Sequence, residues 1–217
     1  MFIHCPTLEL KPYERVQIND KRHYRTPHGD FPSITTVLSV LDTGWLDEWK
    51  ERVGEKEANR ISSVSRGRGT NLHQMCEDYL NNKPLSCKLP DALEMFYSLK
   101  PILTNRINNI HHQEKALYSK KLKIAGTVDV IAEFDGILSI IDFKNSRRVK
   151  TVEQIHHYIL QETFYAAAFY ELSGHEIKQL VTIIAVEDAN PLVFVEKIKK
   201  EYFLELQEIR KLFSKIY

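Results

Sequence analysis

The sequence is poor in cysteine, glycine and proline, and it carries almost no net charge. Its three cysteines, Cys5, Cys76 and Cys87, form no CxxC pair and leave an odd residue, which favours a reduced compartment over a disulfide framework or a zinc finger. The 8 glycines and 8 prolines leave no low-complexity segment. With 30 Lys and Arg against 29 Asp and Glu, the net charge is +1, so any nucleic-acid binding requires a local basic groove.

Long apolar runs are also missing, since none approaches the roughly 18 residues of a transmembrane helix. The first residues, MFIHCPTLELKPYERV, lack a charged segment followed by an apolar one, and Glu9 and Glu14 are atypical of a mitochondrial presequence. We therefore expect a soluble cytoplasmic protein of a bacterium or a phage-infected host. The length of 217 residues predicts a single domain, with a hairpin and helices in residues 1–110 and a sheet core with a C-terminal helix in residues 111–217.

A β-hairpin is the strongest local signal. Two runs rich in β-branched and aromatic residues, 128–134 and 137–143, meet at Asp135 and Gly136. An Asp-Gly pair between such runs is typical of a two-residue type I′ turn, which requires positive φ at both positions. This turn predicts that opposite residues have numbers that sum to about 271.

The predicted register places two carboxylates, those of Asp129 and Asp142, directly opposite each other. Like charges in this position destabilise a sheet, and a divalent cation such as Mg²⁺ would offset them. Lys144 shares their face and is placed to stabilise charge on a phosphate, while the other face carries Val128, Val130, Ile141 and Phe143. Because the D-x-K motif is short, a hairpin with acids there by chance is the alternative.

A second informative stretch is SVSRGRGTNLHQMCEDYL. Its apolar residues from Leu72 to Leu80 recur at helical spacing, and His73 and Glu77 lie at i, i+4, where they can meet each other or a common ion. Arg66 and Arg68 are predicted to precede this helix in a flexible basic segment near its positive N-terminal end, which suits phosphate. A surface histidine without a ligand role is the alternative for His73.

The remaining elements complete a small sheet with helices. Strands are expected over 115–119, 180–186 and 192–196, and Glu114 either faces the site or is a solvated charge. The segment KNSRRVK, which includes Arg147 and Arg148, supplies basic residues for a phosphate backbone beside the hairpin. A helix over about 152–172 carries Gln161 and Tyr165 at i, i+4, and the chain ends in an amphipathic helix. The pattern predicts an α/β (α+β) fold, with a small mixed sheet flanked by helices.

The order of these motifs resembles the PD-(D/E)XK nuclease superfamily, in its RecB-like exonuclease branch. Within it, the sequence resembles the group of the mitochondrial genome maintenance exonuclease and its bacterial and viral relatives. The resemblance extends from about residue 31 to residue 186 and implies a restriction-endonuclease-like core with an N-terminal helical cover. The motifs that carry it are FPSITTVL, LDEWK, RGTNLHQMCEDYL, EKALYSKKLKIAGTVDVIAEFDGILSIIDFKNS, QETFYAAA and TIIAV.

Roles for individual residues follow from this resemblance. It implies that His73, Asp129 and Asp142 bind a divalent metal, Mg²⁺ or Mn²⁺, together with the backbone carbonyl of Phe143. Lys144 would orient the attacking water or stabilise the phosphate. Gln161 and Tyr165 would position the substrate or brace the site. Asn145 departs from the threonine that many relatives have after the lysine, and the cysteine pattern does not fit an iron–sulfur cluster.

The activity implied by the resemblance is metal-dependent hydrolysis of DNA by an exonuclease that prefers single-stranded ends, in replication, repair or recombination. A replication or recombination protein is a possible partner, and no membrane contact is expected. Two alternatives remain open: a structure-specific, flap-type endonuclease of the same fold, and a nucleic-acid-binding module that does not cut.

Overall fold

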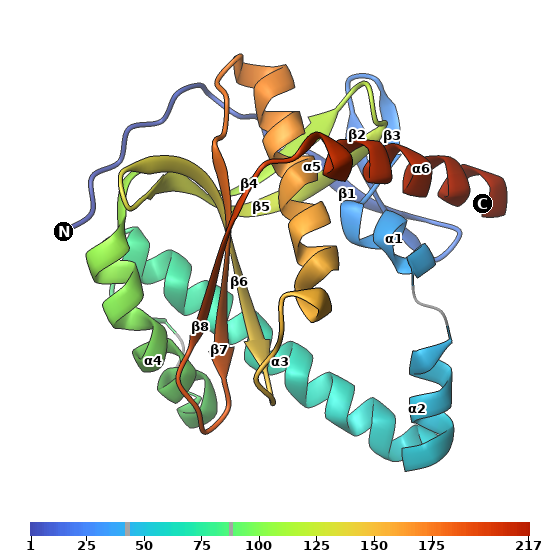
Figure 1. The fold of residues 1–217 in the computed structure, drawn as a ribbon, viewed down its shortest axis with the longest axis horizontal. Coiled ribbons are helices and arrows are strands. Elements are labelled where there is room, and N and C mark those ends of the chain that lie inside the picture. Colours follow the sequence, from blue (N-terminus) through green and yellow to red (C-terminus); the bar gives the residue numbers. More distant parts are fainter. Residues whose placement is uncertain (42–43, 87–88) are drawn as a thin grey trace.

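A five-stranded mixed sheet forms the centre of the molecule. The computed structural model describes residues 1–41, 44–86 and 89–217. The strand order is β4-β5-β6-β7-β8, and only the β6–β7 pair is parallel. Figure 1 shows the sheet with helices around it, which confirms the predicted fold class. The strands are β4 (Ile107–Ser119), β5 (Ile124–Phe134), β6 (Ile137–Ser146), β7 (Gln179–Val186) and β8 (Leu192–Lys197).

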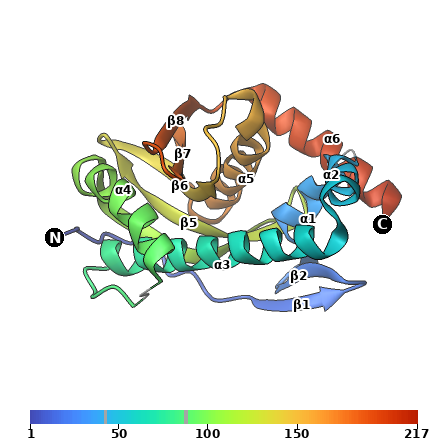
Figure 2. The ribbon, with the colours of Figure 1, turned by 90° about the horizontal axis from the view of Figure 1, so that it is seen from below.

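Helices cover both faces of this sheet, and each face has its own apolar core. On one face α1 (Ile34–Leu38), α5 (His156–Ser173) and α6 (Lys200–Ile216) contribute residues such as Phe164 and Phe169 to one buried cluster. On the other face α3 (Glu55–Leu80) and α4 (Pro90–Arg106) contribute Leu72 and Phe96 to a second cluster. Figure 2 shows α3 and α4 on one side of the sheet and α5 on the other.

A second, smaller sheet lies near the N-terminus. It consists of β1 (Glu14–Ile18), β2 (Lys21–Thr26) and β3 (Gly29–Pro32), all antiparallel. The turn between β1 and β2 has positive φ at Asn19 and Asp20, a conformation that Asn and Asp tolerate better than most residues. Ser33 caps the short helix α1, because its hydroxyl accepts a hydrogen bond from the Thr36 N–H. The small sheet is therefore followed directly by α1, whose apolar residues are buried in the core.

The hairpin formed by β5 and β6 has the predicted register from Phe134↔Ile137 to Val130↔Ile141. Asp135 and Gly136 both have positive φ, as a type I′ turn requires. Arg106 holds the turn in place through hydrogen bonds to both carboxylate oxygens of Asp135. The type I′ turn that the sequence predicts thus sets the pairing of β5 with β6 as far as Val130.

Beyond Val130 the two strands separate, and here one expectation is wrong. Val130, Ile141 and Phe143 lie in the core under α3 and α4, but Val128 packs in the other core, under α1 and α5. The N–H of Phe143 donates a hydrogen bond to the side chain of Asp129. A strict alternation along β5 therefore fails next to the acid, because the Asp129 side chain takes part in the cross-strand contact.

The helix that carries His73 is longer than expected. α2 (Trp45–Val53) is capped by Gly54, and α3 then runs without interruption through the RGRG segment. Arg66 and Arg68 therefore lie inside a helix, and the expectation that they precede its N-terminal end is wrong. Residues 55–65 contain no proline and include good helix formers, so the helix begins upstream and the two glycines are tolerated within it.

Other boundaries differ by a few residues. α4 includes Pro101 and ends at Arg106, where β4 begins, so the boundary expected at residue 110 falls inside a strand. Cys5 and Cys76 are free thiols, and Cys87 lies outside the described residues. Within the described part of the chain, no helix combines the length and apolarity needed to cross a membrane.

Candidate active site

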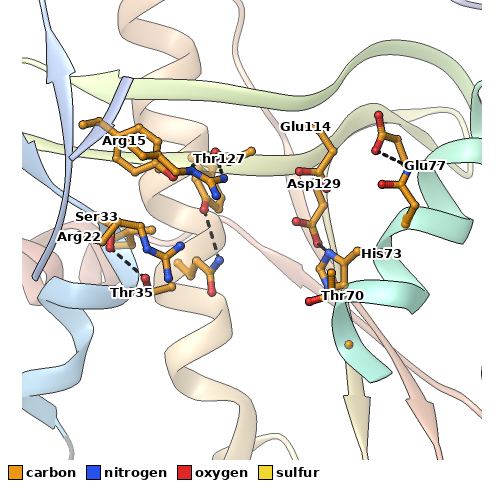
Figure 3. A pocket seen from close by; sticks show the side chains of 17 residues that line it. Arg15, Arg22, Ser33, Thr35, Thr70, His73, Glu77, Glu114, Thr127 and Asp129 are labelled. Carbon is orange, nitrogen blue, oxygen red and sulfur yellow. Dashed lines mark hydrogen bonds and ion pairs between the residues drawn. The ribbon is translucent and has the colours of Figure 1, made fainter. Parts of the chain in front are cut away.

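A pocket of about 400 Å³ lies where the small N-terminal sheet, α3, β4, β5 and α5 meet. Six residues singled out from the sequence line it: His73, Glu77, Glu114, Asp129, Gln161 and Tyr165. In Figure 3 the acids and His73 lie on one side, and Arg15 and Arg22 of the N-terminal sheet lie on the other. The pocket thus has an acidic end and a basic end.

Three potential ligands converge at the acidic end. Ligand atoms of His73, Glu114 and Asp129 all lie within 4.8 Å of one another. His73 Nδ1 is 3.3 Å from Asp129 Oδ2, which also accepts a hydrogen bond of 2.8 Å from the Phe143 N–H. The structure therefore brings His73, Asp129 and Glu114 together, with Glu114 facing the site while its side chain stays exposed to solvent. Metal binding by these residues stays a prediction.

The position of Glu114 depends on an unusual backbone conformation. Glu114 has φ of 47° within β4, in the left-handed region that a non-glycine residue seldom adopts in a strand. Such conformations persist where the surrounding structure fixes them, often at functional sites. The sequence carries no signal for this φ, so it does not specify the orientation of Glu114.

Asp142 and Lys144 form a separate pair next to this group. The Lys144 ammonium contacts Oδ2 of Asp142, and neither residue lines the pocket. Asp142 is fully buried, and its Oδ1 has no hydrogen-bond partner among the described residues. Asp142 also lies outside the group of atoms that His73, Glu114 and Asp129 form. The two hairpin acids thus lie on neighbouring strands just beyond the last paired residues, Val130 and Ile141, instead of forming the predicted cross-strand pair, and they have different partners.

The electrostatics of the pocket reflect this crowding of acids. Burial alone would lower the pKa of His73, but the Asp129 carboxylate outweighs it and raises that pKa to about 9. Burial would raise the pKa of Asp129, yet His73 and Lys144 lower it. The Glu114 side chain is exposed at the pocket, but neighbouring protein displaces part of its water, and this desolvation with the charge of Asp129 raises its pKa to about 7.

The pKa of Asp142 is shifted upward, in the opposite direction to that of Asp129. Burial, with a contribution from Asp129, raises the pKa of Asp142 to about 6 although Lys144 opposes the change. A buried carboxylate with an unpartnered oxygen is costly, and coordination of a cation is one way in which such a charge is compensated. The donor set of one imidazole and carboxylates therefore fits a divalent metal ion.

Gln161 and Tyr165 lie on the α5 side of the pocket. Both are buried, and Gln161 Nε2 donates to Tyr165 Oη over 3.3 Å. Gly126 of β5 faces them so closely that a Cβ atom there would lie 3.0 Å from Tyr165 Cε1 and Oη. The predicted pair is therefore present, and it is packed tightly against β5.

Sequence reasoning missed Glu162, which is fully buried where α5 packs against β7. Its carboxyl group accepts a hydrogen bond from the Thr182 hydroxyl of β7. Burial and the nearby charge of Asp142 raise its pKa well above the usual range. A signal for Glu162 was available in the sequence, because it is an acidic residue within the largely apolar stretch from Ile159 to Phe169. Acidic residues are almost never buried unless they are paired, so an acid on such a helix indicates a specific partner.

The four arginines predicted to bind DNA are dispersed. Arg68 is almost buried, and it pairs with Glu187 at 3.0 Å and with Asp91 at 3.6 Å, away from the pocket. Arg147 lies 3.7 Å from the same Glu187, and Arg66, Arg147 and Arg148 are all exposed. None of the four lines the pocket. Their contact with DNA stays a prediction, and the basic residues at the pocket are Arg15 and Arg22, which sequence reasoning passed over.

Comparison with known proteins relates this chain to a family of exonucleases. No protein-family model matches the chain. The chain is 25% identical over 173 residues to mitochondrial genome maintenance exonuclease 1 of Mus musculus, which covers 74% of this chain and 51% of the relative. The Homo sapiens protein of that name is 25% identical over 174 residues, with 74% and 50% covered. The Xenopus tropicalis protein is 24% identical over 177 residues, with 76% and 51% covered.

These similarities support a nuclease relationship to that family, as the sequence motifs predicted. The chain spans about half the length of the curated relatives it matches. Among solved structures, SSO0001 is 15% identical with a TM-score of 0.43 and covers 83% of this chain and 74% of its own. A protein of Eubacterium rectale assigned by name to the exonucleases is 12% identical with a TM-score of 0.38, covering 85% and 73%.

Proposed function

We propose that this protein is a divalent-metal-dependent DNA exonuclease that hydrolyses phosphodiester bonds, preferentially at single-stranded ends. The observation that carries the proposal is the convergence of His73, Glu114 and Asp129 within 4.8 Å, beside a buried Asp142 with an unpartnered oxygen. The similarity to exonucleases supports hydrolysis of nucleic acid over other uses of a metal. Replication, repair or recombination is the corresponding cellular setting.

The roles of the residues follow from their positions. His73, Asp129 and Asp142 would hold Mg²⁺ or Mn²⁺, with the Phe143 carbonyl and Glu114 as further ligands. The metal would act as a Lewis acid and lower the pKa of a water molecule. Lys144, with its ammonium held by Asp142, would stabilise negative charge on the phosphate undergoing hydrolysis. Gln161 and Tyr165 would brace the substrate on the α5 side.

The substrate is inferred from the pocket as well as from the relatives. A volume of about 400 Å³ is near the lower end of ligand pockets, which run from about 300 to 1,000 Å³. Such a pocket admits a short piece of one strand more readily than an uninterrupted duplex. The low cysteine content is consistent with action in a reducing bacterial or phage-infected cytoplasm, and a replication or recombination protein would be the partner.

The decisive experiment compares linear and circular single-stranded DNA of the same sequence in Mg²⁺, in Mn²⁺ and in EDTA. The proposal predicts metal-dependent release of nucleotides from the linear DNA, an intact circle, and no cleavage by Asp142→Asn, which keeps the side-chain volume but removes the charge. Cleavage of the circle would instead support the flap-type endonuclease. Binding of both DNAs without cleavage in either metal would favour the non-cutting module, and full activity of Asp142→Asn would refute the assigned site.

A further inference from the structure

The basic end of the pocket is formed by Arg15 of β1 and Arg22 of β2. Both side chains line the pocket, and Figure 3 shows them on the side opposite to His73, Glu114 and Asp129. Among the residues that the structure describes, neither guanidinium forms an ion pair with a carboxylate within 4.0 Å. By contrast, Arg25 on the same small sheet pairs with Glu14 at 2.8 Å and with Asp30 at 3.5 Å, outside the pocket.

Arg15 is held in place by uncharged groups. Its Nη2 donates to Thr127 Oγ1 over 3.1 Å, and its guanidinium lies 5.7 Å from the centre of the Tyr24 ring. The Tyr24 hydroxyl is in turn 3.1 Å from the same threonine oxygen. These contacts orient the guanidinium and leave most of its five N–H donors available. Arg15 forms no ion pair with Glu114, but its charge acts on Glu114 across the pocket and favours the ionised carboxylate by lowering its pKa.

The surroundings of Arg22 complete a polar recess. Its backbone carbonyl accepts a hydrogen bond of 2.8 Å from the Ser33 N–H, which ties β2 to the start of α1. The hydroxyls of Ser33 and Thr35 lie 3.0 Å from each other, and both residues line the pocket beside the arginines. Two cations and several hydroxyls thus face one end of the pocket, and no carboxylate of the described residues is paired to either cation.

The charge of this recess suits one kind of phosphate in particular. An internal phosphodiester carries a single negative charge, whereas a terminal phosphate monoester carries close to two at neutral pH and has three strong acceptor oxygens. Two guanidinium groups match the charge and the hydrogen-bonding capacity of the monoester. The recess also lies at the far end of the pocket from the acidic cluster, so a strand end held there would extend toward His73 and Asp129.

We propose that Arg15 and Arg22 form a subsite for the terminal phosphate monoester of a nucleic-acid strand. This inference rests on the proposed function in one respect, since it takes the strand in the pocket to be the substrate. It adds that the protein distinguishes phosphorylated from hydroxyl ends, and that the end so recognised lies in the pocket while a phosphodiester further along the strand reaches the acidic cluster.

The test uses equilibrium binding in EDTA, so that it does not depend on cleavage. Internally labelled single-stranded oligonucleotides of one sequence would carry a 5′-phosphate, a 3′-phosphate or hydroxyls at both ends, and fluorescence anisotropy would give each Kd. We expect one phosphorylated form to bind the wild type about tenfold more tightly than the doubly hydroxylated form. In Arg15→Gln and Arg22→Gln that ratio should fall to near one, whereas Arg25→Gln, the matched control, should retain it.

Each result has a defined meaning. Equal binding of all three oligonucleotides to the wild type overturns the subsite without requiring any variant to fold. If a ratio exists but Arg15→Gln and Arg22→Gln weaken binding to all three forms equally, these arginines contact an internal phosphodiester and the inference is again wrong. Cleavage assays in Mg²⁺ are scored separately: a phosphate-dependent Kd ratio without any cleavage would refute the exonuclease and leave the subsite standing.

Discussion

The N–H of Phe143 donates a hydrogen bond of 2.8 Å to Oδ2 of Asp129, across the point where β5 and β6 separate. The acid of β5 therefore both contacts His73 and satisfies a backbone donor of β6. Since an unsatisfied buried donor is costly, the position of Asp129 is fixed by the fold as well as by charge. One hydrogen bond thus couples the geometry of the acidic cluster to the strand that carries Asp142 and Lys144.

This coupling predicts that two substitutions of Asp129 separate stability from activity. Asp129→Asn keeps an acceptor for the Phe143 N–H, whereas Asp129→Ala leaves that donor unsatisfied and should cost about 1–3 kcal/mol more in the free energy of unfolding. Both variants should lose metal-dependent cleavage, because both remove the carboxylate. Urea unfolding and nuclease assays would measure the two effects. Equal stability of the two variants would show that the hydrogen bond contributes little.

Lys144 should act on turnover more than on binding. Its ammonium is held against the buried Asp142, and only 19% of its side chain is exposed to solvent. Lys144→Met should lower kcat by about 100-fold, the size of effect seen when one stabilising donor is removed from an active site. The Kd for single-stranded DNA should change by less than about threefold, since phosphate contacts elsewhere dominate affinity.

A structural loss must be separated from this catalytic loss. Removing one partner of a buried pair costs about 3–5 kcal/mol, so Lys144→Met is expected to be destabilised. The double variant Lys144→Met with Asp142→Asn removes both charges and should recover part of that stability while remaining inactive. A thermal melt of the two variants would show the recovery, and activity in the double variant would contradict the role of the pair.

Glu114 provides a test of which atoms bind the metal. Because its carboxylate lies within 4.8 Å of the His73 and Asp129 ligand atoms, Glu114→Gln should weaken Mn²⁺ binding about tenfold or more. Glu77→Gln is the matched control, since Glu77 lines the same pocket but is not part of that group. Isothermal titration with Mn²⁺ gives the affinity without DNA. If the affinity of Glu114→Gln for Mn²⁺ were unchanged, Glu114 would not be a ligand, and His73, Asp129 and Asp142 would be the side chains that bind the metal.

The sequence indicates the hairpin well because its determinants are local. Asp135 and Gly136 specify the turn, and the turn sets the pairing from Phe134 to Val130. The strand separation at Asp129 and the positive φ of Glu114 depend instead on contacts with distant segments, and no local pattern encodes them. For the same reason the local pattern of the RGRG segment is misleading: its glycines favour a loop, but α3 continues through them. Arg15 and Arg22 reach the pocket only through the docking of the small sheet.

Stability should depend on pH through Asp78. Burial alone would raise the pKa of this carboxyl, but hydrogen bonds from Ser86 and Gln74 lower it below its ordinary value. The unfolded chain therefore binds the proton more readily, so this contribution is present above the unfolded pKa of about 4 and is lost as the pH falls through the folded value. Asp78→Asn should cost about 1–3 kcal/mol at pH 7 and less at pH 3, as measured by urea unfolding. A cost independent of pH would contradict the assignment.

Gly126 should be intolerant of any side chain, because β5 passes very close to α5 at this point. An added Cβ would lie 3.0 Å from Tyr165 Cε1 and Oη and from Cγ2 of Ile34, and all three atoms belong to buried residues with little room to move. Gly126→Ala should therefore displace the Tyr165 ring, weaken its contact with Gln161, and cost about 1–3 kcal/mol in stability. Cleavage should fall by about tenfold or more, since small displacements of positioning groups have large effects on rate.

The matched control for this glycine lies in α3. A Cβ atom added at Gly67 would have no atom of another segment within 4 Å, and Gly67 lies inside a continuous helix. Gly67→Ala should therefore stabilise the protein by up to about 1 kcal/mol through helix propensity. Thermal unfolding should thus show opposite shifts for the same chemical change at the two positions. If Gly126→Ala were as stable and as active as the wild type, β5 and α5 would have to separate easily, and the tight support of Tyr165 on which the proposed site depends would be absent.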